Sequence, residues 1–453
     1  MRRESIWSVH APFICRLSCT IGISLALASA AWGQAAGMPI STMPSVLTRE
    51  EAVRQALHSN PVLMTVRKQQ GYAEAALILA KTYPYNPVYT GYACYNSGPT
   101  DAGITNRVFL EQYVSLELEL RGQGKHRRAV GAATASRIEW EISHQELATS
   151  IAVIRAFNTV LYRQQKLAFL DDGIKLNEQA FEQIRKQADA GKIKKIDLTL
   201  ARADLDGTRA QRGQTRTTLA IARSELRRLL GTLDDTFAVA GALDVPLPST
   251  DPAAFTQLAL DRRADLQAKR AAICEAEATL RLVNANRFGN PSFGPFFEYD
   301  PTRVSTVGAR LSMPLAIFNS KKAEIRKAQT DVAKIHAEVQ TLELQASQDV
   351  QAALARLADA SHWAEGYQTE VLPNLVQARD ELENLFARND PGVDLARLLT
   401  VKRGYLKASE NLLDARFEIS QAEADLALAV AEPALAIGPM HAVALSTPAT
   451  LQR

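Results

Sequence analysis

Aromatic residues are scarce in this 453-residue sequence, and neither sign of charge predominates. Only 6% of the residues are Phe, Trp or Tyr, although hydrophobic residues make up 47%. Few aromatics beside abundant alanine, leucine and charged residues are typical of long helices in coiled coils. The formal net charge is +3, and a charge so nearly balanced argues against a nucleic-acid partner.

Cysteine is also rare, with four in the whole chain. Cys15 and Cys19 lie in an N-terminal segment with the features of an export signal: two arginines, an apolar core and small residues before a cleavage site after Gly33. The residues around Cys19 do not form a lipoprotein acylation box. Cys94 and Cys274 lie far apart, so no disulfide framework is expected. Residues 1–33 are predicted to be a cleaved signal peptide, and an uncleaved anchor helix is the alternative.

Residue patterns for enzyme chemistry are missing as well. No Ser-His-Asp or Cys-His set can be assembled, and the histidines have no partner at the helical spacing of a metal site. Gly122–Lys125 has glycines and a lysine, but Glu119 stands where a phosphate loop needs glycine and His126 where it needs Ser or Thr. We therefore predict no enzyme activity, no cofactor and no metal site, and a simple turn at 122–125.

The sequence does contain an internal repeat, the first feature to look for in a chain of this length. A capping box at Thr48–Glu51 opens the first copy, and Asp251-Pro252 opens the second. The phrase Ala56–Leu63 then recurs as Ala259–Leu266. This pattern predicts an internal duplication.

The repeat sets the predicted organisation of the chain after the signal peptide. The first repeat covers 34–250 and the second covers 251–432. Residues 433–453 are predicted to be a disordered tail.

Within each copy an Asn-Pro pair ends the first helical stretch, and a two-residue period of apolar and polar residues follows. This period predicts strand pairs at 87–120 and 291–315. More than half of the tyrosines and phenylalanines gather in and just beside these segments, at 83–113 and 288–318. Aromatic girdles on alternating strands are the signature of a transmembrane β-barrel. Two soluble hairpins packed on helices would show the same alternation, so the period alone leaves both possibilities open.

Long helices are predicted after each strand pair, at 125–230 and 321–431. From Lys125 to Asp189 no proline intervenes, and a continuous helix there would span about 95 Å. Turns at Ala190–Lys192 and Asn389–Gly392 would reverse the chain. Apolar residues recur every three or four positions in both copies and so form an apolar stripe, or seam, along one side of each helix. The seam comprises Ile151, Ile154, Phe157 and Leu161 in the first copy, and Val339, Leu342, Ala346, Val350, Ala353 and Leu357 in the second.

Membrane passage and assembly follow from these elements. No apolar run after the signal is long enough for a membrane-spanning helix, so any passage must use strands. Four strands cannot close a barrel, and an open edge in lipid leaves unpaired backbone groups. The chain must therefore pool strands with identical copies in a ring. Two chains would give eight strands and three would give twelve, and the residues alone leave this choice open.

The order of these features resembles the TolC-like outer-membrane efflux protein family over nearly the whole chain after the signal. Four features carry the resemblance: the duplicated layout, Ala56–Pro61, Pro314–Asn319 and the turn at Gly191–Leu198, which Gly392–Leu395 echoes. Ala264 departs from the pattern, because the second copy usually has proline there. The turn at 122–125 is most similar to the heavy-metal efflux branch.

The resemblance implies a mostly α fold with transmembrane β, in which a homotrimer forms a β-barrel in outer-membrane lipid and a long α-helical barrel in the periplasm. It also implies two protein partners, a periplasmic adaptor and an inner-membrane transporter. It places six residues at the periplasmic tip that contacts the adaptor: Gly191, Asp197, Leu198, Gly392, Asp394 and Leu395. The positions of the two aspartates also predict N-caps of the returning helices.

The predicted function is a passive exit duct for small molecules or metal ions, driven by the inner-membrane pump. A periplasmic coiled-coil adaptor or scaffold without a pore is the alternative. Metal ions, drugs and secreted polypeptides all remain open as substrates.

Overall fold

The computed structural model describes residues 46–96, 108–191, 194–243, 251–315, 317–387 and 395–437. The predicted signal peptide and the turn at Asn389–Gly392 lie outside these residues. The helices are α1 (Arg49–Ser59), α2 (Pro61–Arg67), α3 (Gln70–Lys81), α4 (Gln123–Asp189), α5 (Lys195–Leu230), α6 (Pro252–Arg262), α7 (Ala264–Ala285), α8 (Lys322–Gly366), α9 (Leu372–Ala387), α10 (Leu395–Val430) and α11 (Ala434–Ile437). The strands are β1 (Val46–Leu47), β2 (Val88–Tyr95), β3 (Val108–Glu117), β4 (Ala238–Val239), β5 (Ser292–Tyr299) and β6 (Ser305–Ser312).

The helix starts at Thr48 and Asp251 and the break at Asn60 lie where the sequence predicted them. The Thr48 hydroxyl accepts a hydrogen bond from the Glu51 amide at 3.3 Å, and the Glu51 carboxylate accepts one from the Thr48 amide at 3.0 Å. Asn60 ends α1 and caps α2 by accepting from the Leu63 amide at 2.9 Å. Asp251 caps α6 in the same way. Side-chain oxygens thus satisfy amides that have no partner within the helix.

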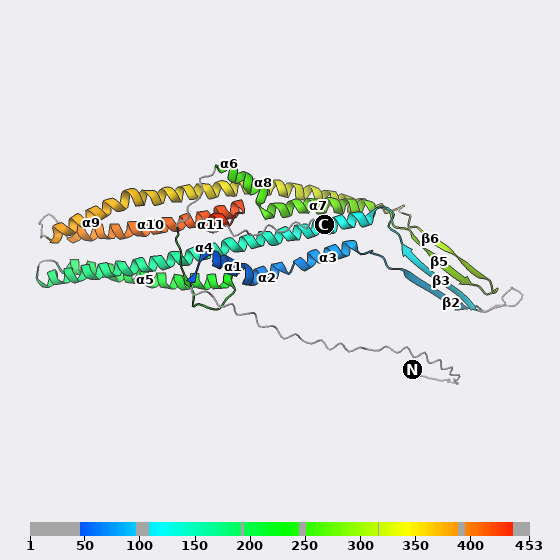
Figure 1. Cartoon of the computed structure of the whole chain (residues 1–453), viewed down its shortest axis with the longest axis horizontal. Helices are drawn as coiled ribbons and strands as arrows, with labels where there is room; N and C mark the ends of the chain where they lie inside the picture. Colours follow the sequence, from blue (N-terminus) through cyan, green and yellow to red (C-terminus); the bar gives the residue numbers. More distant parts are fainter. Residues whose placement is uncertain are drawn as a thin grey trace, which may run out of the picture. The chain divides into compact units, whose positions relative to one another are not determined.

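The long helices dominate the fold (Figure 1). α4 runs for 67 residues without a break, a length of about 100 Å at the usual rise, which confirms the prediction of one helix from Lys125 to Asp189. α5 lies along α4, while α10 lies along α8 and also contacts α4. A π-helical turn at Tyr367–Val371 joins α8 to α9. The predicted apolar seams are buried at Ile151, Ile154, Phe157, Leu161, Val339, Ala346, Val350 and Ala353.

The largest core forms where α1, α4, α5 and α10 meet a small parallel pair of strands, β1 and β4. It includes Leu47, Val53, Ile154, Phe157, Leu226 and Ala427. Arg49 is buried at its edge and donates hydrogen bonds to the carbonyl oxygens of Ala436 and Ala242, each at 3.0 Å. Ala436 belongs to α11 and to this core. The start of the segment predicted as a disordered tail is therefore ordered, because Arg49 and the core hold it; residues 438–453 lie outside the described part.

The four longer strands form one antiparallel sheet in the order β2-β3-β5-β6. The predicted strand pairs at 87–120 and 291–315 thus lie side by side, through β3 and β5. In Figure 1 the sheet lies beyond the ends of α3, α4, α7 and α8. No helix in the described ranges is both long and apolar enough to cross a membrane.

Candidate functional site

The register of the sheet separates its side chains into an apolar and a polar face. Residues paired across neighbouring strands share a face, and alternate residues along a strand point to opposite faces. The apolar face carries Tyr89, Ala93, Tyr95, Val108, Leu110, Val114, Leu116, Phe293, Phe297, Tyr299, Val307, Ala309 and Leu311, with Gln112 and Ser305 as polar exceptions. The opposite face carries the polar residues Thr90, Glu111, Tyr113, Ser115, Glu117, Glu298, Thr306 and Arg310, together with Val88, Tyr92, Phe109 and Phe296.

Charged groups concentrate at the centre of the polar face. Glu111 lies directly opposite Glu298, and Arg310 forms an ion pair with Glu111. The Arg310 guanidinium lies over two rings, 4.9 Å from the centroid of Tyr113 and 5.5 Å from that of Phe296. Arg310 is thus one cation for the two carboxylates of Glu111 and Glu298, so this part of the polar face carries excess negative charge.

The two outer strands of the sheet each have an unused edge. β2 pairs only with β3, and β6 pairs only with β5, among the residues that the structure describes. The outward backbone N–H and C=O groups of β2 and β6 are therefore available to another chain.

Of the predicted turn at Gly122–Lys125, only Gly122 lies outside α4, and Gln123–Lys125 form the first residues of that helix. Gly122 has φ +71° and caps the helix, a conformation that glycine adopts without steric cost. Gln123 is buried; its side-chain oxygen accepts from the Arg121 amide at 2.7 Å, and its amide donates to Asn290 at 2.6 Å. Asn290 in turn donates to the Tyr85 hydroxyl at 3.1 Å. These hydrogen bonds thus tie together the segment that leaves β3, the segment that follows α7 and the segment that enters β2.

The tip residues predicted from the sequence fall partly within the structure. Gly191 has φ +72° and follows α4 directly. α5 begins at Lys195 with Lys194 at its cap position, so Asp197 is the third helical residue and its prediction as the N-cap is wrong. The helix therefore starts three residues upstream of the predicted start, with Lys194 rather than Asp197 at the cap position. Gly392 and Asp394 lie outside the described residues, and Leu395 is the first residue of α10.

A small apolar cluster brings the tip segments together. Leu198 of α5 packs in a cluster with Ile184 and Phe181 of α4, Ala201 of α5 and Leu399 of α10. Residues from both predicted repeats therefore meet beside the first turn. The sequence showed that these helices are amphipathic but not which of them are neighbours.

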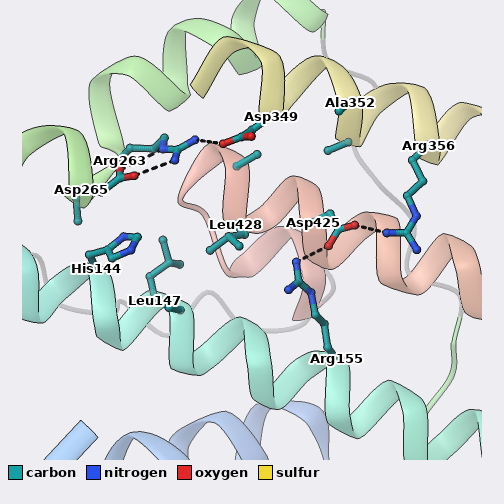
Figure 2. A pocket seen from close by; sticks show the side chains of 14 residues that line it. His144, Leu147, Arg155, Arg263, Asp265, Asp349, Ala352, Arg356, Asp425 and Leu428 are labelled. Carbon is teal, nitrogen blue, oxygen red and sulfur yellow. Dashed lines mark hydrogen bonds and ion pairs between the residues drawn. The ribbon is translucent and has the colours of Figure 1, made fainter. Parts of the chain in front are cut away.

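A network of ion pairs lies between α4, α7, α8 and α10, around a cavity of about 510 Å³ (Figure 2). Asp425 accepts hydrogen bonds from both Arg155 and Arg356. On the other side of the cavity Arg263 bridges Asp265 at 2.8 Å and Asp349 at 2.7 Å.

These ion pairs cross-link helices far apart in sequence. Burial disfavours the ionised form of Asp265, but the hydrogen bonds and charge of Arg263 outweigh this effect and lower the pKa of its carboxyl. Each of the three carboxylates beside the cavity is thus matched by guanidinium groups. Nowhere in the described ranges do three or more His, Cys, Asp or Glu side chains gather as metal ligands would.

A second network, which the sequence gave no reason to single out, joins α4 to α10. The Lys166 ammonium lies 2.9 Å from the Glu410 carboxylate and donates to the Tyr162 hydroxyl at 3.0 Å. Tyr162 donates to Asp414 at 2.6 Å and stacks on Phe417, with ring centroids 4.4 Å apart. Burial opposes the charge of Lys166, but its hydrogen bonds to Glu410 and Tyr162 outweigh burial and raise its pKa. A lysine within a charged helix has no sequence feature that would mark it as central.

Part of the chain matches a known protein family. Residues 52–232 match the model of the family described as outer membrane efflux protein. The resemblance to TolC-like outer-membrane efflux proteins found in the sequence is therefore confirmed.

Individual proteins share both sequence and fold with the chain. The cobalt-zinc-cadmium resistance protein CzcC of Cupriavidus metallidurans is 23% identical over 343 residues, 73% of this chain and 78% of CzcC. The outer-membrane channel OprN is 18% identical with a TM-score of 0.70, over 86% of this chain and 90% of OprN. The open state of the Neisseria gonorrhoeae MtrE outer membrane channel is 16% identical with a TM-score of 0.68, over 86% of this chain and 89% of MtrE. The chain thus has the fold of these outer-membrane channels.

Proposed function

We propose that this chain is the outer-membrane exit duct of a tripartite efflux system, a passive conduit that an inner-membrane transporter drives. The sheet carries this proposal, because it has an apolar face, a charged face and two unpaired edges. Alternation of apolar and polar residues along tilted strands is how a transmembrane barrel meets lipid outside and water inside. Lipid offers no hydrogen bonds to an open edge, so the sheet must be completed by other copies.

Three copies are the assembly we propose. Three four-stranded sheets would join β6 of one copy to β2 of the next and close a barrel of twelve strands around a polar lumen. The long helices would continue this tube into the periplasm for about 100 Å. The outer-membrane channels that share the fold support this arrangement, and the repeated motifs of 34–250 and 251–432 support an origin by duplication.

The tip would contact the periplasmic adaptor through six residues: Gly191, Asp197, Leu198, Gly392, Asp394 and Leu395. The cluster that joins Leu198 to Leu399 supports this assignment, since it brings the start of α5 beside the start of α10. A shift of these helices against each other would open or close the duct.

Divalent metal ions are the substrate class that the relatives favour, because CzcC is named for resistance to cobalt, zinc and cadmium. The carboxylates of Glu111 and Glu298 on the polar face are compatible with the passage of cations. Deletion of the gene should lower zinc tolerance, and the wild-type gene should restore it.

The experiment that tests the duct is fractionation of membranes, extraction in mild detergent and light scattering. We expect an outer-membrane trimer. Val307→Lys, on the apolar face, should cost about 2–4 kcal/mol per copy in lipid and abolish the trimer. Thr306→Lys is the matched control on the polar face and should assemble normally. A soluble periplasmic monomer or dimer would refute the duct and favour the scaffold without a pore.

A further inference from the structure

An exposed apolar surface remains where the sheet meets the long helices. Its members, which we call the collar, are Leu120, Phe288, Met313, Leu315, Ile317 and Phe318. Phe318 is 100% exposed and Leu315 is 74% exposed. Four members of the collar, all but Ile317 and Phe318, line one hollow of about 170 Å³ and are therefore contiguous. An apolar surface of this kind, exposed side by side rather than singly, marks an interaction site.

The collar continues the apolar face of the sheet. Val307, Ala309 and Leu311 lie on that face along β6, and Met313 and Leu315 follow at the same two-residue spacing. The apolar surface therefore extends past the end of the strand toward α8 without a polar interruption on this face.

Basic side chains surround the collar. The guanidinium groups of Arg121 and Arg287 lie 4.7 and 5.4 Å from the centroid of the Phe288 ring. At the starts of α4 and α8 five further cations are exposed: Lys125, Arg128, Lys322, Arg326 and Lys327. None of these five forms an ion pair within the described ranges, whereas the nearby carboxylates of Glu119 and Glu324 already pair with Arg127 and Lys321. The surroundings of the collar thus carry positive charge that is not neutralised within the chain.

Resting on the proposed outer-membrane duct, we propose that the collar inserts into the periplasmic leaflet of the outer membrane and that its basic surroundings bind the phosphates of anionic phospholipids. Apolar side chains next to arginine and lysine match the boundary between acyl chains and headgroups. Long basic side chains reach the phosphates while their stems remain in the apolar layer. The collar would fix the depth of the duct in the membrane.

Tryptophan quenching in vesicles tests this placement. Purified full-length Phe318→Trp is reconstituted in vesicles of phosphatidylglycerol and brominated phosphatidylcholine, with the signal of the parent protein subtracted. Val307→Trp on the apolar face is the control for lipid contact, and Leu233→Trp, at a position 98% exposed after α5, is the control for water. We expect brominated lipid to quench residues 307 and 318 but not 233.

Each other outcome has a distinct meaning. Acrylamide in the aqueous phase serves as the second quencher. If lipid quenches residue 307 but only acrylamide quenches residue 318, the collar lies in water, and the inference fails while the duct stands. If neither quencher reaches residue 318, a neighbouring copy covers the collar and the inference also fails. If lipid does not quench residue 307 either, the proposed duct itself is wrong.

Charge preference is tested by the lipids that copurify from vesicles of mixed phosphatidylglycerol and phosphatidylcholine. Lys322→Gln should lower the ratio of phosphatidylglycerol to phosphatidylcholine on the protein, on the order of fivefold if this one charge acts at the surface. Lys175→Gln, an exposed lysine in the second half of α4, is the matched control and should leave the ratio unchanged. Equal ratios for the two variants would overturn the assignment to anionic phospholipid.

Discussion

Replacement of Gly131 by alanine should loosen the packing of α3 on α4. An added Cβ would lie 2.5 Å from the Cβ of Ala80 and 2.8 Å from the carbonyl oxygen of Ala76. Neither atom can rotate away, because one is a methyl group fixed to the backbone and the other belongs to the backbone. α3 itself must therefore move.

Two opposing effects set the size of this change. Alanine is better than glycine within a helix by about 1 kcal/mol. Overpacking of a closely packed site costs about 1–3 kcal/mol, and the contact with backbone places Gly131 in the upper part of that range. We therefore expect a net loss of about 1–2 kcal/mol in the free energy of local unfolding of α3.

Amide hydrogen exchange of the reconstituted protein measures this loss locally. Exchange within Gln70–Lys81 should become about 5–30 times faster in Gly131→Ala. Gly207→Ala is the control, because its Cβ would meet no atom within 4 Å. Since alanine favours the helix, this variant should slow exchange in α5. Unchanged or slower exchange of α3 in Gly131→Ala would refute the reasoning.

Three further substitutions probe the sheet, the core and the helix network. Gly294→Ala would place a Cβ 1.7 Å from a carbonyl oxygen of β3, so the sheet should open and light scattering should find no oligomer. Arg49→Met removes the buried guanidinium that holds α11 and should cost about 1–3 kcal/mol in denaturant unfolding for each carbonyl oxygen left without a donor. Burial disfavours ionised Glu410, but hydrogen bonds from Lys407 and Lys166 outweigh burial and hold its pKa below 4.5. The stability from this charge is present above pH 4.5 and is lost as the pH falls below it. On acidification from about pH 5 to about pH 3, the denaturation midpoint of Glu410→Gln should therefore fall less than that of the parent protein.

Much of the fold was predictable from short-range patterns. The capping box at Thr48, the Asn-Pro breaks and the alternating strands each reflect interactions between residues close in sequence, so the caps and strand positions were found correctly. Asp197 shows the limit of this approach, since an apolar period does not say where the first helical turn begins. Arg49 shows another limit: the carbonyl groups it holds come from residues 242 and 436, and its role is invisible along the chain.

The sequence by itself determined the long helices, the four strands and their two-faced character, because helix and strand periods are local properties of the backbone. Only the tertiary structure decided that β3 pairs with β5, that Lys166 faces Glu410 and that α5 and α10 meet at Leu198 and Leu399. Many amphipathic helices present similar apolar stripes, so a stripe alone does not select its neighbour. That choice depends on the fit of particular side chains, such as the contact of Gly131 with α3, and this fit exists only when the whole chain is folded.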